Sequence, residues 1–214
     1  MPLNVPGLLA PFQLLLKPRL VLPSLTVKDI RALHFPALHK AGYRGVVFDK
    51  DNCLTVPHRD TLVPELEDSW RQCRRTFGAG NVLIVSNSAG THLDAGEIQA
   101  ESVTHHLGVP VLRHPSMKPA YSCIKLIRNY FATLPKPIKD DELIVVGDRI
   151  FTDVIMANRM RTSHVDGPLA VWTTGVWHKE SMLMRWMEKG LVSLVAKYSE
   201  RQQSTREAAF RELV

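Results

Sequence analysis

From residue 43 onward, short apolar runs alternate with longer stretches in which apolar residues recur every three or four positions. The apolar runs predict buried strands, and the stretches with helical periodicity predict helices between them. The predicted strands are 46–48, 82–85, 109–112, 143–146 and 170–172. The predicted helices lie near 64–77, 94–107, 119–133 and 153–160. This alternation predicts an α/β fold, a three-layer sandwich in which helices cover both faces of a mainly parallel sheet.

The N-terminal part, residues 1–42, has a different pattern and is expected to lie outside this domain. It carries an apolar stripe at helical spacing, followed by the basic residues Lys17 and Arg19. The stripe consists of Leu8, Leu9, Phe12, Leu15 and Leu16. Such a segment is typical of a membrane interface, but packing on the core or on a second subunit explains it equally well. Prolines are frequent in the first two dozen residues and argue against a bilayer-spanning helix.

The C-terminal part, residues 176–214, is predicted to be a helical extension that follows the domain at 43–175. Its apolar positions again recur at helical spacing. They are Leu183, Met187, Leu191, Leu194, Val195 and Tyr198. A helix of this kind packs on a core or on another subunit more often than on a membrane.

Composition and charge narrow the classes of function. The chain has 214 residues, 45% hydrophobic and 22% charged, which excludes a disordered or fibrous protein. Lys and Arg outnumber Asp and Glu by 27 to 21, but residues 1–42 and 175–214 hold the whole excess. A nucleic-acid enzyme would carry basic surface around its site, so no nucleic-acid partner is expected. The three cysteines lack CxxC spacing, which indicates a reducing compartment.

Polar residues that can perform chemistry directly follow the predicted strands. In chain order they are Asp49, Asp51, Ser86, Asn87, Lys118, Asp148 and Asp153. Because the carboxyl ends of parallel strands meet at one edge of a sheet, we expect these groups to converge. Clustered carboxylates repel one another unless a cation lies between them, and Mg²⁺ prefers such oxygen ligands. Each fragment alone is commonly a turn or a helix cap, but together they predict a magnesium-dependent active site.

These motifs resemble those of the haloacid dehalogenase superfamily of phosphohydrolases, subfamily IIIA. The matching stretches are FDKDN at 48–52, VSNS at 85–88, Lys118, and GDRIFTD at 147–153. The chain is most similar to the capless branch that contains the mitochondrial phosphatidylglycerophosphate phosphatases of fungi and their plant and bacterial relatives. The resemblance covers about residues 43–175 and implies a Rossmann-like fold without a cap. Cys53 stands where the first motif commonly has Thr, and we expect it to pack the loop and not to act as a nucleophile.

The resemblance also implies catalytic and metal-binding roles. Asp49 would attack phosphorus and form an aspartyl-phosphate. Asp51 would protonate the leaving oxygen and then activate the hydrolytic water. Mg²⁺ would be held by Asp49, the backbone carbonyl of Asp51, and Asp148. Asp153 would be a further ligand or would orient the others.

Other residues are expected to bind the substrate. By resemblance, Ser86, the backbone of Asn87 and Lys118 would hold the phosphoryl oxygens. Lys50 and Arg149 lie next to the key aspartates and are candidates for contacting a second anionic group of the substrate. Pairing with nearby carboxylates is the alternative for both residues.

The spacing between the motifs leaves no room for a separate cap domain, so the site is expected to be open and to suit a bulky substrate. Residues 43–174 have no net charge, the two ends of the chain are basic, and the N-terminal stripe is apolar. These features favour a lipid as the substrate. The resemblance implies hydrolysis of phosphatidylglycerophosphate to phosphatidylglycerol and phosphate, in cardiolipin biosynthesis, on the matrix side of the mitochondrial inner membrane. Peripheral membrane contact is expected, and contact between identical subunits stays open. The alternatives are a phosphoprotein or nucleotide phosphatase and a non-catalytic membrane-surface scaffold. The sequence has a suitable residue at every position that the chemistry needs, which argues against the scaffold.

Overall fold

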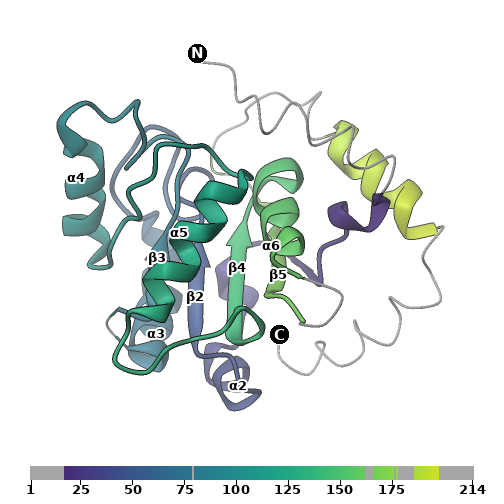
Figure 1. Ribbon diagram of the computed structural model, residues 1–214, viewed down its shortest axis with the longest axis horizontal. Coiled ribbons are helices and arrows are strands. Elements are labelled where there is room, and N and C mark those ends of the chain that lie inside the picture. The colour runs from purple at the N-terminus through teal and green to yellow at the C-terminus, as the bar shows by residue number, and fades with distance from the viewer. Residues whose placement is uncertain (1–16, 79, 162–165, 176, 178–185, 198–214) are drawn as a thin grey trace.

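The computed structural model describes residues 17–78, 80–161, 166–175, 177 and 186–197. Within them, the strands form one parallel sheet in the order β1-β5-β4-β2-β3 (Figure 1). The strands are β1 (Leu25–Val27), β2 (Gly45–Phe48), β3 (Val82–Ile84), β4 (Leu143–Gly147) and β5 (Leu169–Thr173). Parallel neighbours require crossover connections, which helices supply. The predicted α/β class with a parallel sheet is confirmed.

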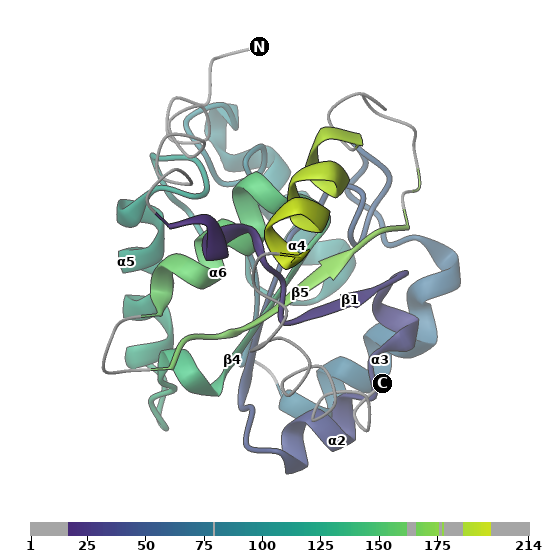
Figure 2. The same ribbon diagram turned by 90° about the vertical axis from the view of Figure 1, so that its right-hand side faces the viewer.

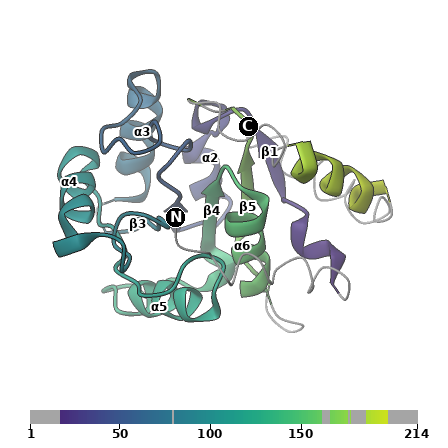
Figure 3. The same cartoon turned by 90° about the horizontal axis from the view of Figure 1, so that it is seen from above.

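Helices cover both faces of the sheet. They include α2 (Phe35–Lys40), α3 (Glu67–Phe77), α4 (Ile98–Leu107), α5 (Tyr121–Ala132) and α6 (Ile155–Met160). A further helix occupies 186–197. Viewed from above, α2 and α3 lie on one side of the central strands and α5 lies on the other (Figure 3). The three-layer arrangement follows from this placement.

The central strands bury side chains on both faces of the sheet. Val46 and Phe48 of β2 join the apolar cluster under α2, α3 and α4, whereas Val47 joins the cluster under α5 and α6. Successive side chains of a strand point to opposite faces. A run in which every position is apolar is therefore the pattern of a strand covered on both sides, and every residue of β2, β4 and β5 is buried.

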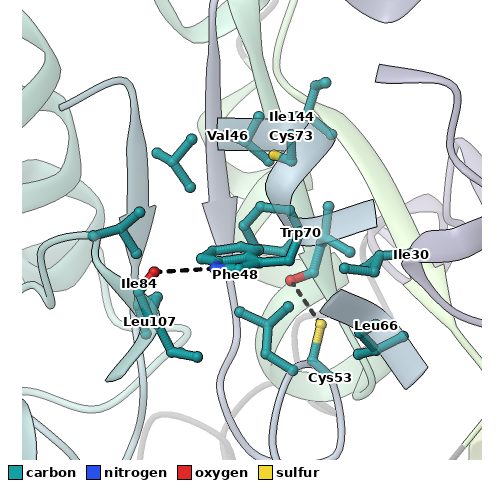
Figure 4. Close-up of a cluster of buried hydrophobic side chains, with 14 of the residues drawn as sticks. Ile30, Val46, Phe48, Cys53, Leu66, Trp70, Cys73, Ile84, Leu107 and Ile144 are labelled. Carbon is teal, nitrogen blue, oxygen red and sulfur yellow. Dashed lines mark hydrogen bonds between the residues drawn. The ribbon is translucent and has the colours of Figure 1, made fainter. Parts of the chain in front are cut away.

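Aromatic packing connects the first strand of the predicted domain to two helices. Phe48 and Trp70 of α3 meet edge to face, with ring centroids 5.3 Å apart (Figure 4). The indole Nε1 of Trp70 donates to the carbonyl of Leu107 at the end of α4, at 3.0 Å. The Cys53 thiol lies 3.9 Å from the carbonyl oxygen of Val146. Burial raises the pKa of that thiol well above its ordinary value, so Cys53 packs the loop as expected.

At the edges of the sheet, one strand prediction is wrong and one strand was not predicted. Residues 109–112 form only a single bridge, between Val111 and Ile84. The Ile84 N–H donates to the carbonyl of Pro110, and the Leu112 N–H donates to the carbonyl of Ile84. Pro110 has no N–H of its own to extend this pairing. Conversely, β1 lies within the range 1–42 and pairs with β5, in register Leu25 to Val171. Three residues are too few to give a recognisable period, so the sequence did not predict this strand.

The connections on the motif side of the sheet are short. Residues 49–63 link β2 to the helical segment before α3, and residues 85–94 link β3 to the segment before α4. Neither connection has room for a cap domain, so the capless architecture is confirmed. In the part of the chain that the structure describes, no helix has the length and apolarity needed to cross a bilayer. The apolar stripe at 8–16, Leu183 and Tyr198 lie outside the described residues.

Candidate active site

Three carboxylates converge where β2 and β4 end. Asp49 directly follows β2, Asp148 directly follows β4, and these two strands are hydrogen-bonded neighbours. Asp153 reaches the same place from a π-helical turn, Ile150–Val154, that opens α6. One oxygen from each of the three carboxylates lies within 4.8 Å of the other two. The predicted convergence of Asp49, Asp148 and Asp153 is therefore what the fold produces.

Lys118 completes this cluster from the loop before α5. Its Nζ donates to Asp49 Oδ1 at 2.6 Å and to Asp153 Oδ1 at 2.7 Å, and its side chain is only 2% exposed. Burial alone would lower the pKa of Lys118, but the charges of Asp153 and Asp49 outweigh burial and raise that pKa. The Lys118 ammonium group is therefore favoured in its charged form and is fixed beside the Asp49 carboxylate.

Asp49 is held in an environment that opposes its charge. Burial raises the pKa of its carboxyl to about 6, against an ordinary value of 3.8, although Lys118 lowers it and Asp153 raises it further. The side chain is 11% exposed, so it is accessible from one side only. A carboxylate that is poorly solvated but adjacent to a cation suits both nucleophilic attack and metal binding.

The donor set fits a magnesium ion. The clustered groups are all carboxylates, which are hard oxygen donors of the kind that Mg²⁺ prefers over nitrogen and sulfur ligands. Gly147 allows the third carboxylate to approach, because a Cβ added at this position would overlap the carboxyl of Asp153. Asp49, Asp148 and Asp153 would therefore hold the ion, and Lys118 lies on the flank of that site.

The Asp51 carboxyl points away from the metal cluster into the loop after β2. Its Oδ1 accepts from the Lys50 ammonium at 2.7 Å and from the His58 N–H at 3.0 Å. Its Oδ2 accepts from the Ser88 hydroxyl at 3.0 Å. The side chain is 28% exposed, in contact with solvent. A carboxyl that is near Asp49 but outside the cluster can exchange protons with a substrate or with water.

Ser86 and Asn87 lie beside the cluster at the end of β3. The buried Ser86 hydroxyl lies 2.9 Å from the Ser88 hydroxyl and accepts from the Ser88 N–H at 3.1 Å. Sequence reasoning assigned only the backbone of Asn87 to phosphate binding and missed its side chain. That amide accepts from the Lys118 N–H at 2.6 Å and donates to the Lys118 carbonyl at 3.3 Å. Asn87 therefore fixes the backbone of the lysine that contacts Asp49.

The two candidates for contacting a second substrate anion have different positions. Lys50 is 1% exposed and donates to Asp51 and to the carbonyl of Arg59 at 3.0 Å, with Asp60 at 3.9 Å. This geometry favours the alternative of local pairing for Lys50. Arg149 is exposed at the rim, and its backbone N–H donates to Asp153 Oδ2 at 3.2 Å.

Two further residues near the site were missed by sequence reasoning. The buried His114 ring places Nε2 2.9 Å from the carbonyl oxygen of Ser86 and Nδ1 2.6 Å from that of Ser116. It thereby joins the loop after β3 to the loop that carries Lys118. Glu188 of the helix at 186–197 accepts from the N–H of Ile150, at 3.1 Å. The contact of His114 with Ser86 and that of Glu188 with Ile150 join residues 28 and 38 positions apart, so no local pattern indicates them.

A parallel three-layer fold with this aspartate and lysine cluster at the carboxyl edge of its sheet defines a capless phosphohydrolase of the haloacid dehalogenase type. More specifically, the chain belongs to the mitochondrial PGP phosphatase family, whose model matches residues 5–175. No solved structure matches the chain significantly.

Named relatives come from plants, fungi and bacteria. The phosphatidylglycerophosphate phosphatase 1 of Arabidopsis thaliana is 34% identical over 88% of this chain. The match covers only 55% of the length of the plant protein. The mitochondrial phosphatidylglycerophosphatase of Saccharomyces cerevisiae is 38% identical over 79% of this chain and 86% of its own length. A probable phosphatase of Bacillus subtilis is 27% identical over 64% of this chain and 72% of its own length.

Proposed function

We propose that the protein is a magnesium-dependent phosphatidylglycerophosphatase that converts phosphatidylglycerophosphate and water into phosphatidylglycerol and phosphate. The observation that carries the chemistry is the buried group in which Lys118 bridges Asp49 and Asp153 beside Asp148. The substrate follows from family membership and from the names of the relatives.

Asp49 is the proposed nucleophile. Its carboxylate attacks phosphorus and displaces the glycerol oxygen, which gives an aspartyl-phosphate. Asp51 donates a proton to the departing oxygen and then takes one from the water that hydrolyses the aspartyl-phosphate. Bound Mg²⁺ would neutralise charge on the phosphoryl oxygens and on the surrounding carboxylates. The hydrogen bond from Ser88 and the ion pair with Lys50 keep the Asp51 carboxyl oriented during both steps.

Lys118 and Ser86 are the proposed phosphate ligands. The Lys118 ammonium is held 2.6 Å from the attacking carboxylate, so it is placed to stabilise charge on the transferring group. The Ser86 hydroxyl lies at the same edge, with the backbone of Asn87 next to it. Because Asn87 also fixes the lysine backbone, one loop positions both parts of the phosphate site.

The absence of a cap fits a lipid substrate. An open site does not enclose its substrate, and a phosphate monoester at a membrane surface can enter it without leaving the bilayer. By its similarity to a mitochondrial relative, we also propose that the protein acts on the matrix side of the mitochondrial inner membrane, as a peripheral protein. The expected segments 1–42, 43–175 and 176–214 are assigned to membrane or subunit contact, to catalysis and to a helical extension. Residues 17–42 also contribute β1 and α2 to the catalytic fold.

A substrate panel tests this function. Purified protein is assayed for phosphate release from phosphatidylglycerophosphate in micelles, from phosphopeptides and from nucleoside monophosphates, each with and without Mg²⁺. We expect kcat/KM to be highest for the lipid and activity to be lost with a chelator. Higher kcat/KM for a phosphopeptide or nucleotide would replace the lipid assignment, and no turnover of any substrate would favour a scaffold.

A further inference from the structure

Large exposed apolar side chains occur around the loops that carry the motifs and on the helix at 186–197. Among the residues that the structure describes, the large exposed ones are Val56, Leu93, Ile98, Tyr121, Trp186, Met187 and Leu194. Val56 lies in the connection after β2 and Leu93 in the connection after β3, whereas Ile98 begins α4 and Tyr121 begins α5, after the loop that carries Lys118. The last three lie on the helix at 186–197.

The helix at 186–197 has two distinct faces. Leu191, Val192 and Val195 pack against the apolar cluster under α5 and α6, and Glu188 is buried on the same side. These positions follow the spacing of one helical face. On the outer face, Trp186 is 74% exposed, Met187 52% and Leu194 60%. This helix is packed on the core, yet large apolar side chains are exposed on its outer face. Such an exposed apolar face indicates a contact surface.

The charge on the outer face has one sign. Lys189 and Lys197 are exposed there, whereas the acidic residue of this helix, Glu188, faces inward. In a twofold contact between two copies, the outer face of one helix would meet the outer face of the other. Among the described residues of the helix, that face has no carboxylate to pair with the lysines. An anionic lipid surface complements both features, because tryptophan and leucine enter the interfacial region while lysines reach the head groups.

This helix is attached to the catalytic edge. The Glu188 carboxylate accepts the N–H of Ile150 at 3.1 Å, and Ile150 lies between Asp148 and Asp153 in the chain. Figures 1 and 2 show the helix, in yellow, beside the sheet at the end where the β4 and β5 arrows point. A membrane that contacts its outer face would therefore lie next to the open site.

We propose that the outer face of the helix at 186–197 docks on an anionic phospholipid bilayer, and that the exposed apolar residues around the catalytic loops face the same surface. This proposal rests on the proposed function for its substrate but is tested separately from it. Docking through this face would place the open site next to the lipid head groups, where the phosphate of the substrate lies.

Vesicle co-sedimentation of the full chain tests the surface. The vesicles contain phosphatidylcholine alone or mixed with phosphatidylserine, so neither contains the substrate or the product. The test variant is Lys189→Gln/Lys197→Gln, and Trp186→Gln/Leu194→Gln removes apolar contact. The matched control is Lys40→Gln/Lys136→Gln, which removes the same charge from exposed residues at the opposite edge of the sheet. Circular dichroism and activity on a small soluble phosphate ester verify that each variant is folded.

At low salt, loss of Lys189 and Lys197 should weaken binding to the phosphatidylserine vesicles about 30-fold, and the control should bind like the wild type. The difference should shrink at high salt. The Trp186 and Leu194 variant should also bind more weakly. Equal binding by test and control variants would overturn the proposal. A wild-type dimer that Trp186→Gln/Leu194→Gln converts to a monomer would overturn it in favour of a subunit contact.

The proposed function can fail independently of this surface. Protein that binds the vesicles through Lys189 and Lys197 but does not hydrolyse phosphatidylglycerophosphate would refute the function and support the surface. Protein that hydrolyses the lipid in micelles, with vesicle binding unaffected by either variant, would refute the surface and leave the function standing.

Discussion

Asp49 is placed where its charge is costly to the fold. The folded protein keeps its proton up to about pH 6, whereas an ordinary aspartate releases it near 3.8. Between these values the folded state binds more protons than the unfolded state, so stability falls as pH rises through this window. The full stabilising effect of the protonated group is present below the lower value and is lost above the upper one. This is the cost of burying a carboxyl group, to which the neighbouring carboxylates add.

Asp49→Asn should therefore stabilise the metal-free protein while abolishing turnover. At neutral pH the expected gain in unfolding free energy is on the order of 1 to 3 kcal/mol, and it should shrink towards about pH 4. Urea unfolding with a chelator measures the gain at both pH values, and phosphate release measures turnover. Lower stability of the variant at neutral pH, or substantial residual activity, would contradict the proposed role.

Asp51→Asn should slow both proton-transfer steps but keep the nucleophile. Because the second step depends on activating water, the aspartyl-phosphate should accumulate in this variant. Quenched reactions followed by mass spectrometry detect it. Asp60→Asn is the control, since Asp60 lies in the same loop and also faces Lys50, at 3.9 Å. Turnover by Asp51→Asn equal to that of the control would remove the acid-base assignment.

The position of a residue can be predicted from the sequence when it depends on neighbouring residues, and not when it depends on contacts with distant parts of the chain. Asp49 and Asp148 could be placed from the sequence because each directly follows a strand and parallel strands end at one edge, and Asp153 because it lies five residues after Asp148. The contacts of Asn87 with Lys118 join residues 31 positions apart, and those of Glu188 with Ile150 join residues 38 apart. Pairings of that kind depend on how loops and helices pack, which periodicity does not encode.

At the scale of elements, the helix at 186–197 supports the loop that carries two of the proposed metal ligands. Glu188→Leu leaves the Ile150 N–H without this acceptor, whereas Glu188→Gln keeps an oxygen in the same place. We expect Glu188→Leu to lose about 1–3 kcal/mol of stability and to require more Mg²⁺ for half-maximal activity. Glu188→Gln should stay close to the wild type in both. Magnesium titrations of activity that coincide for all three proteins would exclude a positioning role.

Elements were predictable where apolar residues form long or uninterrupted patterns. The strands β2, β4 and β5 are apolar at nearly every position, and α3 and α5 show a clear helical period. The failures lie at the margins of the sheet. Pro110 interrupts a run that otherwise resembles a strand, and β1 owes its pairing to β5 and not to its own three residues.

At the scale of the whole molecule, the N-terminal segment is the part whose role is open to direct test. Val21 is buried and β1 belongs to the sheet, so a truncation through residue 27 would remove structural elements. Deleting residues 2–16 avoids this. We expect the deletion to weaken binding to anionic liposomes, most strongly at low salt, and to leave activity on a small soluble ester unchanged. Unchanged liposome binding with an altered sedimentation coefficient would instead identify a subunit contact.

The central claim is that the phosphoryl group of phosphatidylglycerophosphate passes through Asp49. The most direct measurement is to react the Asp51→Asn variant with substrate labelled in its terminal phosphate, in the presence of Mg²⁺, and to locate the label by peptide mapping. We expect a label on the peptide that contains Asp49, its loss with hydroxylamine, and its absence from Asp49→Asn. Label on another residue, or wild-type hydrolysis of the lipid without any labelled protein in the variant, would contradict it.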